Sequence, residues 1–535
     1  MSFGSDPFAS EEHDPLNFEG YDPLISLVNR KKVDPKALQK LNKKRYTAWV
    51  LYDVANTFYA SGILSFISLA WILILGQKNG YSYGDATALY SVVIAIASVF
   101  MAIMLPILGS MSDVTQQRKN YVVFFSVVSI VSTWLFIILD SFFWVLLVFS
   151  ISMITYQWAQ VFYDSMLPGI VPPGKEAKLS SIAITIGYLG GAIITAYAWF
   201  LSQSHDAPNT EEGKLDLGYS EQMAYAVIVG FTLFAIPIFF VREQNWDEIN
   251  ALVFLNEMDE WQAIYSAFAE SIEEDITGSS LYTSPKTMWK IAKESLQELG
   301  ESFKDIRHNN QAMFYYIVAY FIIADLANLM ALINIVFLRD SVGLSENGIF
   351  FIIMLSGVSL LILTPIIGVI CDKYGAKTGY KFVGILWFLA LTIMIFQDFI
   401  LPGWTIYIAA LAFGPALSGV WVAQRQMVLE LVPNDSQIGK YFGLTKFSGK
   451  LSSAIGPLIF AATLKFSERV YSDSPNQIQI AYRWSITSLT VFLAVGFYIL
   501  MKYVPNKSVE FKKRKRRIAD VLDASETLTS HPNIP

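Results

Sequence analysis

The sequence predicts an all-α integral membrane protein with twelve transmembrane helices in two pseudo-symmetric six-helix bundles. An apolar composition, twelve long apolar segments and motifs repeated in each half support this prediction. Of the 535 residues, 54% are hydrophobic and 16% are charged, and the mean hydropathy is +0.43. Soluble domains carry about 25% charged residues. This chain therefore has too few polar side chains to cover the surfaces of several soluble domains.

Twelve segments are long enough to cross a membrane, which takes about 20 mostly apolar residues for ~30 Å of hydrocarbon. Polar residues, Gly or Pro separate them, at residues 47–75, 86–111, 120–139, 142–166, 179–202, 222–241, 312–338, 346–370, 379–398, 403–430, 439–464 and 481–503. Their continuous apolar character, without alternation, favours helices over the strands of a β-barrel.

The distribution of Lys and Arg predicts the orientation in the membrane. Eight basic residues lie between Arg30 and Arg45, before the first segment, and the run KKRKRR follows the last segment at 512–517. The loop at 205–218, on the opposite side, is acidic. Both termini are therefore predicted to be cytoplasmic. We expect a multi-pass protein of the plasma membrane, with the vacuolar membrane as the alternative.

The apolar segments divide the chain into five parts. We expect a cytoplasmic tail, a six-helix bundle, a cytoplasmic helical linker, a second six-helix bundle and a basic cytoplasmic tail, at residues 1–45, 46–241, 242–311, 312–504 and 505–535. The linker pattern is typical of amphipathic, acidic helices. Such a linker either lies under the bundles or binds a partner.

Three motifs occur once in each half, which indicates internal duplication. GSMSDVTQQRK begins at Gly109 after the second segment, and GVICDKYGAK begins at Gly368 after the eighth. A Val-Pro pair follows the fourth segment and another follows the tenth. An Asp-x-x-Asn motif lies in the first segment at Asp53 and in the seventh at Asp325.

The Gly-x-x-x-Asp pattern with basic residues after it resembles the signature of the major facilitator superfamily. We identify a closer resemblance, to the "unknown major facilitator" family, in AWVLYDVANTFY, SSIAITIGYLGG and YFGLTKFSGKLSSAIGP, at 48–59, 180–191 and 441–457. That family is grouped with the autophagy-related vacuolar amino-acid effluxers of fungi. The resemblance covers residues 46–504. It implies the major facilitator fold and transport by two bundles that rock around a midplane site.

Ionisable residues are rare within the apolar segments, where each costs about 2.5–3.5 kcal/mol on insertion scales. Away from the segment ends they occur in only five of the twelve, as Asp53, Asp164, Asp325, Arg425, Lys446 and Lys450. Four of these five segments, the first, fourth, seventh and tenth, begin the four three-helix units of the duplicated chain. By resemblance, these four line the central cavity.

The two Asp-x-x-Asn motifs are candidate substrate- and proton-binding sites. Asp53 shares a helix face with Asn56, and Asp325 shares one with Asn328, because each pair is three residues apart. We expect both pairs to face one cavity from opposite halves. No histidine lies in the apolar segments, so the carboxylates are the natural proton carriers. Alternatively, each Asp bonds its Asn or a backbone amide and fixes helix packing.

Asp164 and Arg425 occupy equivalent positions in the two halves with opposite charge. We expect a gating ion pair between them, against the alternatives of a static pair or of separate side chains reaching water. Arg425 and Gln424 are also candidates for binding a substrate carboxylate. Lys446 and Lys450 lie one turn apart. They either neutralise Glu430, contact an anionic substrate or reach water, and reaching water is favoured for Lys446.

The loop motifs supply further gating candidates. Each contains an Asp with a basic residue nearby, Asp113 with Arg118 and Asp372 with Lys373. By resemblance, each Asp pairs with a basic residue or with a helix N-terminus. These contacts would latch the two halves together in the outward-open state.

No nucleotide-binding loop, catalytic motif or metal-ligand cluster is present, and the single Cys371 excludes an internal disulfide. We therefore expect no enzyme activity, no cofactor and no metal site. The leading hypothesis is a proton-coupled secondary transporter of a small polar solute, and the resemblance favours amino-acid efflux. The alternatives are a membrane sensor or scaffold that signals through the linker, and a lipid or glycolipid flippase. We expect a monomer that contacts its solute, protons and membrane lipids, and no nucleic acid.

Overall fold

The computed structural model describes eight stretches of the chain, residues 35–115, 117–171, 174–204, 217–241, 306–397, 399–433, 437–453 and 455–506. One compact unit, Asn42–Glu243 with Leu281–Ala519, holds all of them except the first residues of the first helix. Most of the predicted linker, most of the predicted C-terminal tail and residues 1–34 lie outside the described residues. The predicted division into five parts therefore stays a prediction.

Every predicted apolar segment is helical. The first half contains α2 (Pro35–Thr57), η1 (Phe58–Ile67), α3 (Ser68–Lys78), α4 (Tyr83–Thr115), α5 (Arg118–Ile138), α6 (Phe142–Ile170), α7 (Glu176–Ser204), α8 (Leu217–Ala235) and η2 (Ile236–Phe240). The second half contains α12 (Gln311–Asp340), α13 (Glu346–Tyr374), α14 (Ala376–Phe396), η3 (Gly403–Thr405), α15 (Ile406–Leu431), α16 (Ile438–Ser452), α17 (Ile455–Val470) and α18 (Gln477–Tyr503).

Eleven helical stretches of the described chain are long and apolar enough to cross a membrane. The remaining predicted segment, the first in the chain, consists of the consecutive helices α2, η1 and α3. The stretches that contain α6, α12 and α15 are the most enclosed. Of the residues in an apolar 18-residue window of each, 61–72% are buried, against 28–50% in the other stretches. These three carry ionisable residues, so the charges of the sequence mark the centre of the bundle.

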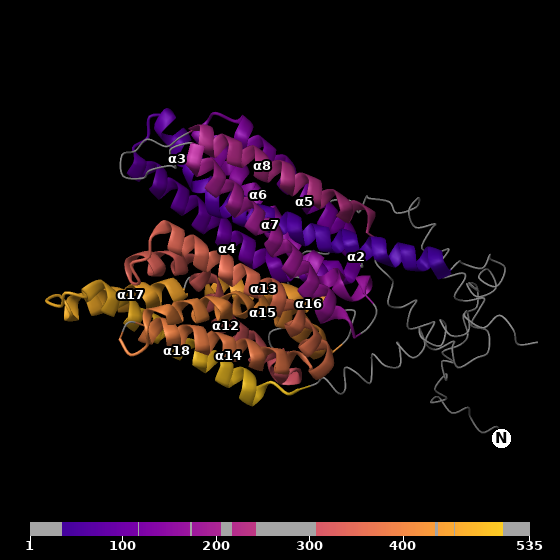
Figure 1. The fold of residues 1–535 in the computed structure, drawn as a ribbon. Helices are drawn as coiled ribbons and strands as arrows, with labels where there is room; N and C mark the ends of the chain where they lie inside the picture. The colour runs from indigo at the N-terminus through magenta and orange to yellow at the C-terminus, as the bar shows by residue number, and fades with distance from the viewer. Residues whose placement is uncertain are drawn as a thin grey trace, which may run out of the picture. The chain divides into compact units, whose positions relative to one another are not determined.

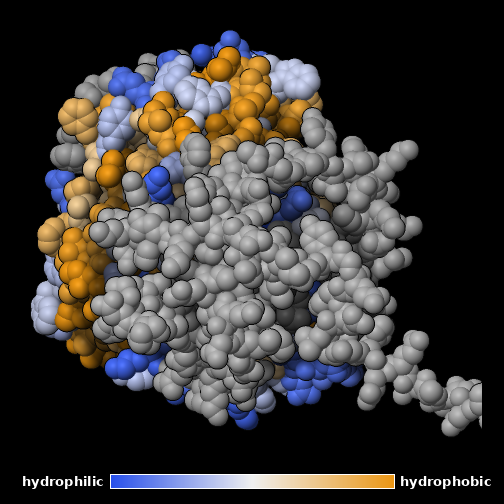
Figure 2. Space-filling view, turned by 90° about the vertical axis from the view of Figure 1, so that its right-hand side faces the viewer, coloured by the Kyte–Doolittle hydropathy of each residue, from blue (hydrophilic) through white to orange (hydrophobic). Residues whose placement is uncertain are grey.

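Large apolar side chains cover much of the outer surface, as a membrane protein requires. On α4, for example, Val92, Ile96 and Val99 are all more than half exposed. Figure 2 shows hydrophobic residues on the uncovered part of one face of the molecule. Such a surface is favourable in contact with lipid and unfavourable in contact with water.

The two halves meet through helices α4 and α16 and through α7 and α13 (Figure 1). Glycines allow the close approach. A Cβ on Gly109 would collide with the backbone of Gly439, and a Cβ on Gly443 would collide with the backbone of Leu105. Gly368 of α13 packs equally closely against α7. These contacts lie at the end of the bundle that carries the basic loops, and they hold the halves together there.

Two of the predicted segments depart from a regular α-helix in their interior, whereas the 3-10 helices η2 and η3 lie at segment ends. Residues 58–67 form a π-helix in the first segment, a rare conformation that is frequent at functional sites. The eleventh segment is interrupted, because α16 ends at Ser452 and α17 begins at Ile455. Gly456 and Pro457 in the first turn of α17 favour a new helix start over a continuous helix.

Candidate substrate-binding site

A cavity of about 330 Å³ lies inside the bundle and is lined from both halves. The first half contributes α2, η1, α6 and α7, and the second contributes α12, α15 and α16. The first, fourth, seventh and tenth predicted segments all take part, as expected, and the fifth and eleventh take part as well. The lining is rich in polar side chains, namely Asp53, Asn56, Thr57, Ser61, Tyr156, Gln157, Gln160, Tyr188, Tyr320, Asn328, Trp421, Gln424, Arg425, Lys446 and Lys450.

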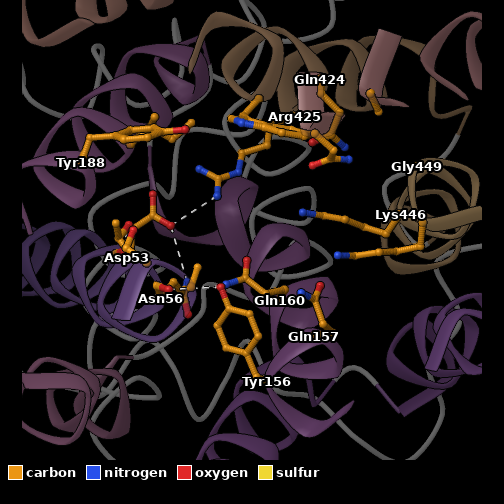
Figure 3. Close-up of a pocket in the computed structure, with 18 of the residues that line it drawn as sticks. Asp53, Asn56, Tyr156, Gln157, Gln160, Tyr188, Gln424, Arg425, Lys446 and Gly449 are labelled. Atoms are coloured by element: carbon orange, nitrogen blue, oxygen red, sulfur yellow. Dashed lines mark hydrogen bonds and ion pairs between the residues drawn. The ribbon is translucent and has the colours of Figure 1, made fainter. Parts of the chain in front are cut away.

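Asp53 and Asn56 form one wall of the cavity at the end of α2 (Figure 3). The side-chain amide of Asn56 donates to Asp53 Oδ1 at 3.5 Å. The Tyr156 hydroxyl donates to the carbonyl of Asn56 at 3.1 Å, and the Thr57 hydroxyl donates to the carbonyl of Asp53 at 3.0 Å. The Asp53 side chain is 10% exposed and lines the cavity.

Arg425 of α15 joins the carboxylates of the first half. Its Nε donates to Asp164 Oδ1 at 2.9 Å, and its Nη1 donates to the Ser180 hydroxyl at 3.1 Å. Its Nη2 lies 3.5 Å from Asp53 Oδ1. The contact with Asp164 is thus closer than the contact with Asp53. The expected ion pair between Asp164 and Arg425 is present, whereas its gating role stays a prediction.

Two stacked aromatic rings support the guanidinium group of Arg425. The rings of Trp49 and Tyr163 are 4.5 Å apart and nearly parallel. Their centroids lie 5.4 and 5.5 Å from the Arg425 guanidinium carbon. The Tyr163 hydroxyl donates to the Trp49 carbonyl at 3.0 Å and fixes the pair. The cation–π contacts and the three polar partners of the planar guanidinium group together hold Arg425 in one orientation.

Lys446 of α16 lies across the cavity from Asp53 in Figure 3. Its ammonium is 2.6 Å from Asp164 Oδ2. The expectation that Lys446 reaches water is therefore wrong, because Asp164 has 0% exposure and offers a closer partner. Asp164 is held by two cations of the second half. Lys450 lies one turn further along α16 and also lines the cavity.

Asp325 does not face the cavity, which corrects the prediction of two equivalent acidic sites. Its side chain is 1% exposed and is not part of the lining, although Asn328 is. The carboxylate lies against the start of α17, where a Cβ on Gly456 would be 2.6 Å from Asp325 Oδ2. A new helix N-terminus presents free N–H groups and partial positive charge, which attract a carboxylate.

Asp113 caps a helix of the opposite half. Its carboxylate accepts from the backbone N–H of Gly439 at 2.8 Å and from that of Lys440 at 2.7 Å. These are the second and third residues of α16. Arg118 lies 3.1 Å from the same carboxylate. Asp113 therefore binds both a helix N-terminus and a basic residue.

Asp372 makes the equivalent contact in the other direction. It accepts from the backbone N–H of Ala177 at 3.0 Å and from that of Lys178 at 2.8 Å, at the start of α7. Lys373 points elsewhere, with its ammonium 5.3 Å from the ring of Tyr374. Both carboxylates thus act as N-caps supplied by the opposite half. Their role in gating stays a prediction.

A family comparison decides where the chain belongs. The model of the vacuole effluxer Atg22-like family matches residues 41–501. The chain belongs to the Atg22-like family. An MFS-type transporter of Bacillus subtilis, YxiO, is 22% identical over 478 residues, which cover 88% of this chain and 97% of that protein. A protein of Aquifex aeolicus is 21% identical over 475 residues, with 88% and 99% covered.

Solved structures of the major facilitator superfamily share the fold of this Atg22-like chain. The proton:xylose symporter XylE matches with a TM-score of 0.56 at 15% identity, over 89% of this chain and 99% of that one. A bacterial ferroportin homologue in an outward-facing state matches with a TM-score of 0.55 at 13% identity, over 86% and 99%. The protein is therefore a multi-pass membrane transporter of the major facilitator fold, in a family of transporters rather than enzymes.

Several residues of the site were not predicted as ligands. Trp49, Tyr163 and Ser180 position Arg425, and no pattern in the sequence distinguishes them from other buried aromatic or small residues. Lys446 and Lys450 did carry a signal, because two lysines one turn apart in an apolar segment are costly. The sequence alone could not show that a carboxylate of the other half lies beside the first of them.

Proposed function

We propose that this protein is a proton-coupled secondary transporter that moves a small polar solute by alternating access. The observation that carries the proposal is the polar cavity at the centre of the bundle. It is lined by Asp53 from the first half and by Arg425, Lys446 and Lys450 from the second. Membrane proteins keep ionisable side chains at this depth for pathways and binding sites.

Asp53 is the best candidate for the proton carrier. It lines the cavity and is held only by contacts of 3.5 Å, from Asn56 and Arg425. Asp164 is enclosed between two cations at 2.9 and 2.6 Å, so its charge is stabilised and shielded. Asp325 lies at a helix terminus outside the lining. Protonation of Asp53 would remove its negative charge and weaken its ion pair with Arg425. Because Arg425 belongs to the other half, proton binding would thereby weaken a contact between the halves.

The contacts between the halves support a closed gate at the basic-loop end. Asp113 and Asp372 cap helices of the opposite half there. Asp164 and Arg425 lie near the same ends of α6 and α15. With the basic loops on the cytoplasmic side, contacts at this end favour an outward-open state. All of these contacts must break for the cavity to open to the cytoplasm.

Amino acids are the first solutes to test, and efflux is the first direction. Both follow from the Atg22-like family description and from the resemblance of the sequence to vacuolar effluxers. Vesicles containing the purified protein should accumulate the solute under an imposed proton gradient, and a protonophore should abolish accumulation.

A cavity-filling variant separates transport through this site from leakage. Ala60 lines the cavity, whereas Ala88 is exposed on α4. Ala60→Trp should abolish accumulation, and Ala88→Trp should leave it near the wild-type rate, with both proteins eluting as folded species. Equal accumulation by the two variants would exclude this cavity as the transport site. A lack of gradient-driven movement of any solute would favour a sensor or scaffold.

A further inference from the structure

Lys450 is a cation in the cavity without a protein partner. Within the described residues, its ammonium makes no ion pair and no hydrogen bond, although Lys446 one turn away is paired with Asp164. Lys450 is only partly buried and so keeps part of its hydration, but a charge inside a helix bundle is more stable beside an oppositely charged partner. The repulsion between two lysines one turn apart adds to the cost of leaving Lys450 unpaired. A ligand that neutralises Lys450 would remove both penalties.

The other charges of the site are already engaged with one another. Asp164 holds Arg425 and Lys446, and Asp53 holds Arg425 more weakly. The site therefore contains three cations and two carboxylates, which leaves one positive charge in excess. Of the described residues that line the cavity, Asp53 is the only acidic one. A solute ammonium group would have to compete with Arg425 for it.

We infer that the cavity binds a carboxylate-bearing solute with a net charge of −1, and that Lys450 is the residue that binds its carboxylate. This inference rests on the proposed function, and it replaces neutral amino acids, the first solutes suggested there, with anions of net charge −1. A neutral zwitterion fits less well, because its ammonium would lie beside three cations. A phosphate monoester also fits less well, because it carries about −1.5 to −2 charges at pH 7 against one excess positive charge. Asn328, Gln157 and Gln160 supply uncharged hydrogen-bonding groups around the solute.

Three compounds that share one carbon skeleton and differ in net charge provide the test. Leucine is a zwitterion, 4-methyl-2-oxopentanoate carries −1, and leucinamide carries +1. Alanine, pyruvate and alaninamide form a smaller series, and inorganic phosphate is the fourth type of probe. Binding to the purified protein is measured as the increase in melting temperature with ligand concentration. At least one keto acid should bind ten-fold more tightly than its amino acid, and the amides should bind most weakly.

Three variants assign the effect to Lys450. Lys450→Met should weaken keto-acid binding at least ten-fold, and Lys450→Arg should retain most of it. Lys465→Met, an exposed position on α17, is the matched control and should bind like the wild type. If the methionine variant fails to fold, the wild-type preference for a keto acid over its amino acid still tests the charge assignment.

Four results would overturn the inference. They are tighter binding of an amino acid than of its keto acid, preference for phosphate, undiminished keto-acid binding by Lys450→Met, and no response to any probe at 10 mM. Binding needs no gradient, so its result is independent of the vesicle experiment. Gradient-driven uptake of a neutral amino acid would contradict the charge assignment and leave the proposed function intact.

Discussion

The same Asp-x-x-Asn motif produces two different environments in the two halves. Asp53 of the first half faces the cavity, 3.5 Å from Arg425. Asp325 of the second half faces the start of α17 instead, and only its partner Asn328 reaches the cavity. Duplication has kept the residues while the surroundings have diverged.

The neighbouring helix explains the difference. Beside Asp53, helix α7 is continuous, and a Cβ on Gly187 would lie 3.1 Å from the Asp53 backbone carbonyl oxygen rather than from its carboxylate. Beside Asp325, Gly456 lies in the first turn of α17, and a Cβ there would be 2.6 Å from Asp325 Oδ2. The two motifs therefore meet their neighbouring helices differently, Asp53 through its backbone and Asp325 through its carboxylate. Sequence symmetry alone is a poor guide to functional symmetry in such proteins.

The largest expected effect concerns Asp164, which has Arg425 as its counterpart in the second half. Asp164→Asn leaves the buried Arg425 and the partly exposed Lys446 without their shared carboxylate. Breaking a buried ion pair costs about 3–5 kcal/mol, so the melting temperature should fall steeply. Asp140→Asn, at an exposed position, is the control. A melting temperature equal to that of the control would show that Asp164 does not stabilise the contact between the halves.

Gly456→Ala tests the placement of Asp325 against α17. The new methyl group would collide with the Asp325 carboxylate, and overpacking of this kind costs about 1–3 kcal/mol. The double variant Gly456→Ala with Asp325→Ala should recover part of the lost melting temperature, because the obstructing carboxylate is gone. Strictly additive losses in the double variant would contradict the contact.

The loop carboxylates provide a contrast, because there the symmetry is preserved. Asp113→Ala and Asp372→Ala each remove an N-cap supplied by the opposite half, at about 0.5–2 kcal/mol. Hydrogen exchange should therefore accelerate at the start of α16 in the first variant and at the start of α7 in the second. Similar increases at the two helices would support equivalent latches. Faster exchange at only one of the two helices would show that the two carboxylates are not equivalent.

Much of the fold was predictable because a helix that crosses lipid needs a long run of apolar residues. Long apolar segments bounded by Gly, Pro and charge became helices, and the paired motifs marked the duplication. Hydropathy does not distinguish helix types, so the π-helix at Phe58–Ile67 and the interruption after Ser452 were not predicted. Both lie close to the cavity.

The sequence predicts a cavity-lining side chain correctly only where the position of the residue's own helix decides which way that side chain points. Asp53 and Arg425 belong to central helices and line the cavity. The direction of Asp325 depends on where α17 begins, and the partner of Lys446 is a carboxylate from the other half. Contacts of this kind follow from tertiary packing, and a single segment does not encode them.

The central claim is that Asp53, and not Asp325, carries the coupled proton. The most direct test compares Asp53→Asn and Asp325→Asn in vesicles, with a substrate of the wild-type protein, in two modes. The first mode is accumulation driven by a proton gradient, and the second is exchange without a gradient. We predict that Asp53→Asn retains exchange and loses accumulation, whereas Asp325→Asn accumulates like the wild type. Accumulation by Asp53→Asn, or its loss in a folded, exchanging Asp325→Asn, would contradict the account.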